Sequence, residues 1–180
     1  MKTKSEEEVI LVDAEDRKTG IMNKMEAHEK GLLHRAFSVF IFNSDGRWLL
    51  QQRASHKYHS PSLWSNTCCS HPRDGETVLE AATRRLKEEM GMYCQLEHQF
   101  HFTYRCQLPS GLIEHELDHV LLGYSDTPPT INTQEVHDFR YVTTQDLEKE
   151  LIAHPERFTV WFKLCFHKVQ NRMRELERQR

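Results

Sequence analysis

The chain has 180 residues, a net charge of −3 and 28% charged residues. This length is typical of one domain, and the near balance of charges excludes a dominant nucleic-acid-binding surface or acidic tail. No apolar run approaches the ~18 residues of a transmembrane helix, and residues 1–8 lack the apolar segment of a signal peptide. We therefore expect a cytoplasmic protein that binds neither nucleic acid nor membrane.

The first half of the chain predicts mainly β-structure. Residues 9–13 indicate a first strand, and residues 18–20 are expected to form the turn that leaves it. A β-branched and aromatic run over 36–42 ends in an Asn-Ser-Asp-Gly turn and resumes over 48–53, which is the pattern of a hairpin. Residues 54–66 contain a proline, serines and a pair of histidines without periodicity, so we expect a loop over the site.

The second half predicts helices and strands in mixed order. Apolar residues recur at helical spacing between residues 76 and 90, and Gly91 ends that helix. The other expected elements are a long hairpin over 96–108 and 112–124, a strand over 136–142, a helix over 144–153 and a last helix over 155–178. Without a βαβ repeat, this order favours an α+β fold, with a mixed β-sheet sandwich flanked by helices in a single domain.

Cysteines and carboxylates suggest reactive and metal-binding positions. Five cysteines form an odd set without CxxC spacing, which argues against a disulfide framework and a cysteine zinc site. Glu114 and Glu116 lie two apart in a strand, so their carboxylates project from one face and repel unless a cation or a proton lies between them. The spacing alone is equally compatible with a solvated face of an edge strand and with a metal site.

Residues 66–92 carry the most informative motif. From Ser70 onward they resemble the Nudix box, which reads Gly, five residues, Glu, seven residues, Arg-Glu, an aliphatic, one residue, Glu-Glu, one residue, Gly, an aliphatic. The matching positions are Glu76, Arg84, Leu86, Glu88, Glu89, Gly91 and Met92. Ser70 replaces the first Gly, and Arg85 replaces the Glu that follows the Arg. A Nudix hydrolase uses an acid cluster there to hold metals, so the cation at position 85 weakens a hydrolase interpretation.

Three further motifs extend the resemblance from Val9 to Trp161. With Asn-Thr-Cys-Cys-Ser-His-Pro at 66–72, Gly-Leu-Leu-His-Arg-Ala-Phe at 31–37 and Glu-His-Glu at 114–116, the chain resembles the type I isopentenyl diphosphate isomerases. That resemblance implies one Nudix-like catalytic domain over 1–180. Its expected parts are an N-terminal strand and metal-binding segment at 9–36, a Nudix-box region at 70–92 and a C-terminal helix at 155–178.

The same resemblance implies an activity in isoprenoid biosynthesis. It is the isomerisation of isopentenyl diphosphate to dimethylallyl diphosphate, by metal-dependent protonation and deprotonation through a tertiary carbocation. The expected partner is this small-molecule substrate, and the expected assembly is a monomer.

The resemblance also implies two metal sites. One would hold Mn²⁺ or Zn²⁺, for which a mixture of imidazole and carboxylate ligands is suitable, through His28, His34, His71, Glu114 and Glu116. The other would hold a Mg²⁺ that also contacts the substrate diphosphate, through Glu89 and the backbone carbonyl of Cys69. Several of the other histidines, such as His98, His101, His137 and His167, are expected to be plain surface residues.

Acid–base and substrate-binding roles follow from the same resemblance. Cys69 and Glu116 are the implied acid–base pair, in an order left open, and a cysteine near metal and histidine is expected to have an accessible thiolate. Cys68 is expected to be structural, because adjacent residues do not readily present both thiols to one site. The implied substrate-binding residues are Lys24, Arg53, Lys57 and Arg85 at the diphosphate, Trp161 at the cation and Tyr104 in the polar pocket.

Two other functions compete with the isomerase. A Nudix hydrolase acting on a nucleoside diphosphate derivative is disfavoured by Arg85, Ser70 and Cys69. A non-enzymatic module that binds metal or diphosphate would not need a paired thiol and carboxylate.

Overall fold

Strand β3 is the centre of the sheet, because its apolar side chains are buried on both faces. The computed structural model describes residues 7–179. In chain order the elements are β1 (Glu8–Val12), β2 (Lys18–Asn23), α1 (Lys24–Lys30), β3 (His34–Phe42), β4 (Trp48–Arg53), β5 (Trp64–Ser65), β6 (Cys68–Ser70), α2 (Val78–Met90), β7 (Leu96–Gln107), β8 (Ile113–Tyr124), β9 (Val136–Val142), α3 (Thr144–Ala153), the 3₁₀ helix η2 (Pro155–Arg157) and α4 (Val160–Arg178). Residues 1–6, on which most of the signal-peptide expectation rests, lie outside the described residues.

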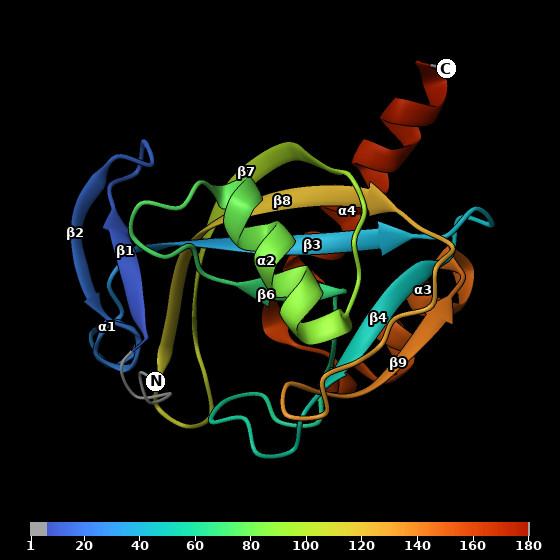
Figure 1. Ribbon diagram of the computed structural model, residues 1–180. Helices are drawn as coiled ribbons and strands as arrows, with labels where there is room; N and C mark the ends of the chain where they lie inside the picture. Colours follow the sequence, from blue (N-terminus) through green and yellow to red (C-terminus); the bar gives the residue numbers. More distant parts are fainter. Residues whose placement is uncertain (1–6, 180) are drawn as a thin grey trace.

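The sheet is mixed, as expected. Strand β3 pairs in parallel with β8 and antiparallel with β1, β4 and β6 (Figure 1). Strand β8 continues antiparallel into β7, and β4 pairs with β9. The parallel β3–β8 pair connects the N-terminal part of the chain to the long hairpin β7–β8.

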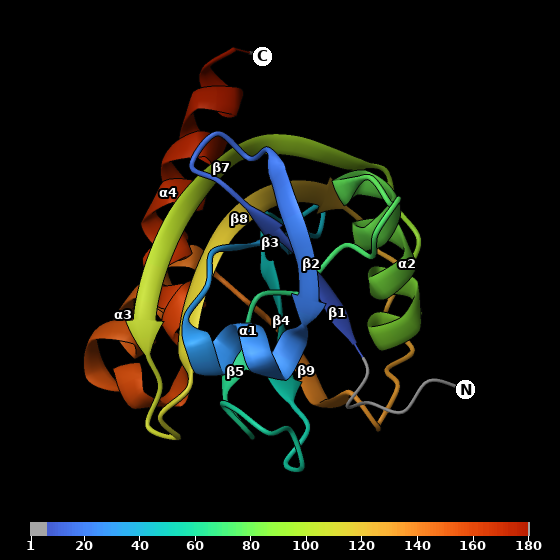
Figure 2. The same ribbon diagram turned by 90° about the vertical axis from the view of Figure 1, so that its left-hand side faces the viewer.

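Helices cover both faces of this sheet, which confirms the α+β architecture. On one face, Ala82, Leu86 and Met90 of α2 pack against Phe37 and Val39 of β3 and their neighbours. On the other, apolar residues of α4 pack against alternate residues of β3, β4 and β8. Figure 2 shows the strands between α4 and α2. Within residues 7–179, no helix is both long enough and apolar enough to cross a membrane.

A side-chain capping box sets the start of helix α2, and a glycine in the left-handed conformation sets its end. Thr77 and Glu80 form a capping box at its N-terminus, in which each side chain bonds to the other's backbone N–H. The helix ends at Gly91, which has a φ of 62°. The helix therefore begins at Val78, two residues after the expected start.

The N-terminal hairpin differs from the expectation. Residues 18–20 belong to strand β2, and the turn lies earlier, because the Asp13 carboxylate accepts the backbone N–H groups of Glu15 and Arg17. An unexpected helix, α1, follows, in which the Asn23 side chain accepts from the N–H groups of Met25 and Glu26. Its seven residues are too few for a clear helical periodicity in the sequence.

Two other boundaries also differ. The segment 54–66 is a loop for most of its length, but it ends in the short strand β5, and β6 follows directly. The last helix does not run continuously from residue 155. Pro155 begins a 3₁₀ turn, the Thr159 N–H donates to the Trp64 carbonyl, and the α-helix begins at Val160.

Replacing Gly91 by alanine tests the end of α2. The added Cβ would lie 2.5 Å from the Thr130 carbonyl oxygen, in addition to the left-handed strain of about 1–2 kcal/mol. We expect Gly91→Ala to lower the free energy of unfolding by more than about 2 kcal/mol in urea titrations. Gly46→Ala is the control, because Gly46 has a φ of 72° with nothing within 4 Å of an added Cβ. Equal losses in the two variants would contradict the proposed clash.

Candidate active site and metal centre

Histidines and carboxylates from four parts of the chain converge beside the start of β3. Each of His28, His34, His71 and Glu116 offers one ligand atom, and these atoms all lie within 4.8 Å of one another. His28 comes from α1, His71 follows β6, and His34 and Glu116 are register partners in the parallel β3–β8 pair. The sheet therefore brings together four of the five residues expected to bind Mn²⁺ or Zn²⁺.

Glu114, the fifth expected residue, lies beside this group. Its Oε1 is 3.8 Å from His28 Nε2, and Glu116 Oε1 is 3.5 Å from His34 Nε2 and 2.9 Å from His71 Nε2. Glu114 and Glu116 project from the same face of β8, as their spacing predicts. The structure buries both residues, with Glu114 2% exposed and Glu116 8% exposed. This excludes the solvated edge strand that the spacing left open.

Hydrogen bonds at the other ring nitrogens prepare these imidazoles as ligands. His28 Nδ1 donates to the Lys24 carbonyl at 2.6 Å, and His34 Nδ1 donates to the Leu32 carbonyl at 2.8 Å. Because each carbonyl requires the proton on Nδ1, the lone pair lies on Nε2. His28 Nε2, His34 Nε2 and Glu114 Oε1 are buried without a hydrogen-bond partner. Unpaired buried atoms of this kind are costly, and a bound cation would satisfy all three.

The two carboxylates have opposite pKa shifts. Burial, together with the charge of Glu116, raises the pKa of Glu114 well above its usual value. Burial also acts to raise the pKa of Glu116, but its close contacts with the His34 and His71 rings outweigh it and hold that pKa well below the usual range. Tyr104 donates to Glu116 Oε2 at 2.7 Å, so the expected pocket residue contacts the expected acid–base residue.

His59 belongs to the same group, although the sequence did not single it out. Its Nε2 lies 3.6 Å from Glu114 Oε1, and its ring packs edge-on against Trp161 with centroids 5.7 Å apart. Burial is the main cause that lowers its pKa to about 2. His59 lies in the loop 54–66, and the only signal was the presence of two histidines in a segment expected to cover the site.

A cavity of about 370 Å³ opens over the cluster. Among its lining residues are most of those expected from the sequence: Lys24, Arg53, Lys57, Cys69, His71, Arg85, Glu89, Glu114, Glu116 and Trp161. His28, His34 and Tyr104 contact the carboxylates instead. The structure thus gathers all the expected site residues around one cavity.

The two adjacent cysteines face opposite sides of strand β6. Cys68 is fully buried in the apolar cluster under α2, whereas Cys69 lines the cavity. Burial raises the pKa of the Cys69 thiol to about 12, with the nearby Glu89 and Glu116 carboxylates adding to the effect. The accessible thiolate expected from the sequence is therefore corrected to a protonated thiol, because burial disfavours the charged form.

Each cation expected to meet a diphosphate is near a carboxylate or a carbonyl group. Arg85 donates to Glu89 at 2.5 Å and to Glu88 at 2.8 Å, and Lys57 forms an ion pair with Glu135. Lys24 pairs with Glu7 at 3.0 Å. These pairs keep the cationic side chains at the cavity wall.

Arg53 joins the polar wall to the aromatic wall. It donates to the carbonyls of Ser60 and His59, and its guanidinium carbon lies 5.3 Å from the Trp161 ring centre. Glu89, the expected Mg²⁺ ligand, is also held by Gln51, which donates to it at 3.0 Å. These contacts orient the side chains without any contribution from a ligand.

Comparison with known proteins identifies the family. The sequence model of the NUDIX domain matches residues 32–162. An isopentenyl-diphosphate Delta-isomerase of Pectobacterium atrosepticum is 55% identical over 162 residues, which cover 90% of each chain. The chain belongs to the isopentenyl-diphosphate Delta-isomerase family. A second member, from Serratia proteamaculans, is 52% identical over 87% of this chain and 88% of its own length.

Solved structures with lower identity share the fold. A Deinococcus radiodurans protein superposes with a TM-score of 0.69 at 21% identity, over 82% of this chain and 90% of its own. The MutT protein of Methanosarcina mazei superposes with a TM-score of 0.63 at 16% identity, over 77% of this chain and 94% of its own. The Nudix-like fold expected from the box is thereby confirmed.

The buried imidazoles predict a pH dependence of stability in the chelator-treated protein. Burial lowers the pKa of His71 to about 3, so the folded state keeps this ring neutral while the unfolded chain protonates it below about pH 6.5. A histidine whose pKa is lowered by folding stabilises the folded state at pH values above its unfolded pKa. This stabilisation is lost as the pH falls toward its folded pKa. From pH 6.5 down to about 3, the wild type should lose about 1.4 kcal/mol per pH unit more than His71→Asn.

Urea titrations at a series of pH values measure this difference. His137→Asn is the matched control, because His137 is exposed on β9 and its loss should leave the wild-type slope unchanged. Parallel pH profiles for the wild type and His71→Asn would contradict the buried neutral ring.

Proposed function

We propose that this chain converts isopentenyl diphosphate to dimethylallyl diphosphate, as a step of isoprenoid biosynthesis in the cytoplasm. The observation that carries the proposal is the placement of the Cys69 thiol and the Glu116 carboxylate on one cavity beside four cationic side chains. The relatives with about half of their residues identical are named for this activity. All the proposed residues come from one chain, so a monomer suffices.

The reaction requires two groups that handle protons. A proton must be added at one carbon of the alkene and removed from another, through a tertiary cation without a heteroatom to stabilise it. Cys69 on β6 and Glu116 on β8 lie on two of the strands that pair with β3, and both face the cavity. The thiol holds a proton and the carboxylate is ionised, so the resting site contains one donor and one acceptor. The reverse reaction exchanges their roles.

Tyr104 and the aromatic wall support this chemistry. The Tyr104 hydroxyl donates to Glu116 and holds its carboxylate toward the cavity. Trp161 is 4% exposed and lines the same cavity, where its π face can stabilise a developing cation by about 2 kcal/mol once water is excluded. The paired acid and base and the aromatic surface together suit a carbocation intermediate.

The diphosphate would take the place of the carboxylates that now face the cations. We propose that Lys24, Arg53, Lys57 and Arg85 bind its oxygens. Arg offers a planar fork and Lys a point charge, and both suit phosphate. Because Arg85 occupies the acid position of the Nudix hydrolases, this side chain would hold the substrate where a hydrolase holds a metal.

Two metal ions fit the available donors. Mn²⁺ or Zn²⁺ would be held by His28, His34, His71, Glu114 and Glu116, and Mg²⁺ by Glu89, the Cys69 carbonyl and the substrate. The first ion would keep both buried glutamates ionised, and the second would neutralise the diphosphate. The unpaired buried nitrogens and the Glu114 oxygen support the first of these assignments.

Isotope exchange tests the reaction directly. In D₂O, an isomerase transfers solvent deuterium into the carbon skeleton, whereas a hydrolase leaves every C–H bond intact and releases phosphate. We expect deuterium in the dimethylallyl product and in recovered isopentenyl diphosphate, no inorganic phosphate, and loss of exchange with a strong chelator. Mass spectrometry and a phosphate assay measure both outcomes. Phosphate release without deuterium uptake would establish a hydrolase.

Paired cysteine variants test the acid–base assignment. Cys69→Ala removes the proton-exchanging thiol and keeps the backbone carbonyl, so kcat should fall by at least about 100-fold. Cys68→Ala is the matched control: it should keep kcat near the wild-type value while losing about 1 kcal/mol of stability from its apolar cluster. Steady-state kinetics and urea titration distinguish the two, and the reverse pattern would refute the assignment.

A further inference from the structure

A second group of histidines lies on the other face of strand β8. His98 and His101 of β7 and His119 of β8 each offer a ring nitrogen, and these atoms all lie within 4.8 Å of one another. His98 and His101 are exposed, as the sequence led us to expect, but they are not isolated side chains. Successive strand residues alternate in direction, so His119 projects away from the face that carries Glu116 and Asp118. The group is therefore separate from the candidate active site.

An irregularity in β7 creates the cluster. In a regular strand, residues three apart such as His98 and His101 would point to opposite faces. The register between β7 and β8 shifts between His98 and Phe100, so one extra residue lies in β7 at this point. Such a bulge re-aims the side chains next to it. As a result His98 and His101 both approach His119, which is the direct register partner of His101.

The buried ring, His119, is already oriented as a metal ligand. Its Nε2 lies 2.9 Å from Asp16 Oδ2, and its Nδ1 lies 2.9 Å from His98 Nε2. A carboxylate only accepts hydrogen bonds, so the Asp16 contact places the ring proton on Nε2. The Nδ1 lone pair of His119 therefore points toward the two other imidazoles. A carboxylate behind a ligating histidine is a recurrent partner in metal sites.

Asp16 is itself firmly placed. Arg35 donates through Nε to Asp16 Oδ1 at 2.7 Å and through Nη2 to the Asp16 carbonyl at 2.6 Å. Asp16 has a φ of 61°, a conformation that Asp and Asn tolerate better than most other residues. The turn between β1 and β2 thus holds a carboxylate behind the histidine cluster.

We propose that His98, His101 and His119 form a second metal site, which binds one divalent transition ion such as Zn²⁺. Three imidazoles suit Zn²⁺, which takes nitrogen ligands in tetrahedral geometry and would keep a fourth position for water. Asp16 would orient His119 and connect the site to the β1–β2 hairpin. Bound metal would thereby join that hairpin to the edge strand β7.

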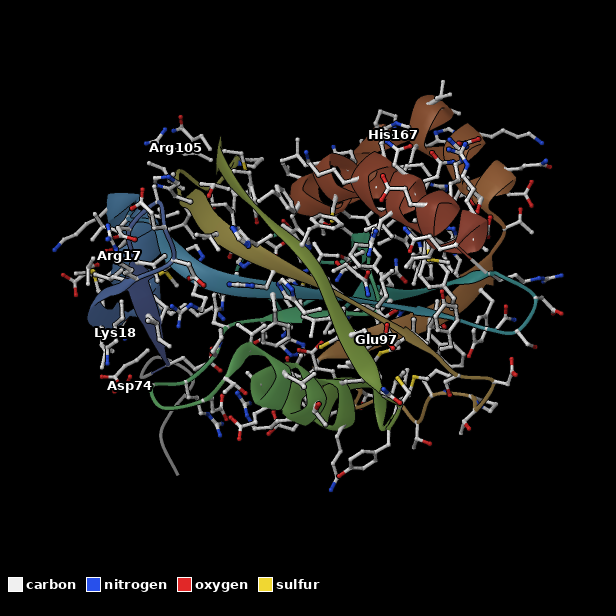
Figure 3. The ribbon with its side chains drawn as sticks, turned by 90° about the horizontal axis from the view of Figure 1, so that it is seen from above. Arg17, Lys18, Asp74, Glu97, Arg105 and His167 are labelled. Atoms are coloured by element: carbon white, nitrogen blue, oxygen red, sulfur yellow. The ribbon has the colours of Figure 1, made fainter. Side chains whose placement is uncertain are left out.

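Metal counting tests the proposal. The protein is dialysed against Zn²⁺ at neutral pH, and bound zinc is measured by mass spectrometry. His98→Gln/His101→Gln should bind one equivalent fewer than the wild type and keep its kcat, because neither residue lines the active-site cavity. His137→Gln/His167→Gln is the matched control, since it also removes two exposed imidazoles. Figure 3 shows His167 on α4, far from Arg17, which follows Asp16 in the chain.

A change at Asp16 separates a built site from surface histidines that bind zinc weakly. Asp16→Asn keeps all three ligands and tolerates the same backbone conformation, but it removes the charge behind His119. Zinc affinity at this site should fall about 10- to 100-fold, as for other partners of metal ligands. Equal zinc stoichiometry in the wild type and the His98/His101 variant would overturn the proposal. Unchanged affinity in Asp16→Asn would overturn the role of Asp16.

Discussion

The parallel pairing of β3 with β8 is the constraint on which the remaining structure depends. It runs from His34 opposite Glu116 to Phe42 opposite Tyr124. Toward the Phe42 end, alternate side chains of both strands enter the two apolar cores, and at the His34 end they supply an imidazole and a carboxylate to the same cluster. A slip of one residue would turn Glu114 and Glu116 away from the histidines. Apolar packing in the cores therefore holds the geometry of the polar site.

Elements with a strong local pattern could be predicted from the sequence. The strand at 136–142 and the helix at 144–153 have the expected bounds, because β-branched and aromatic residues mark the strand and a threonine cap marks the start of the helix. The elements that escaped prediction are short, namely α1, β2, β5, β6 and η2. Their formation depends on contacts with distant residues, as in the pairing of Cys69 with Ser38, which no local pattern reports.

The site shows the same division between residues that a sequence motif marks and residues that depend on distant contacts. Motif resemblance named His28, His34, His71 and both glutamates, and the sheet brings them together. His59 could not be found in this way, because its approach to Glu114 depends on the path of the loop 54–66. The protonated state of Cys69 also depends on burial, which follows from the packing of several elements and not from neighbouring residues.

The ion pairs around the cavity affect the time for which a ligand stays bound. Lys24, Lys57 and Arg85 already face Glu7, Glu135 and Glu89 respectively, so an entering diphosphate replaces one set of anionic oxygens by another. Its net binding energy is the difference between two similar interactions. Reactant and product of the proposed isomerase carry the same diphosphate. The binding energy of both is therefore lowered equally, and their equilibrium is unchanged. The carboxylates at the wall thus favour fast release, so that a tightly held product does not limit turnover.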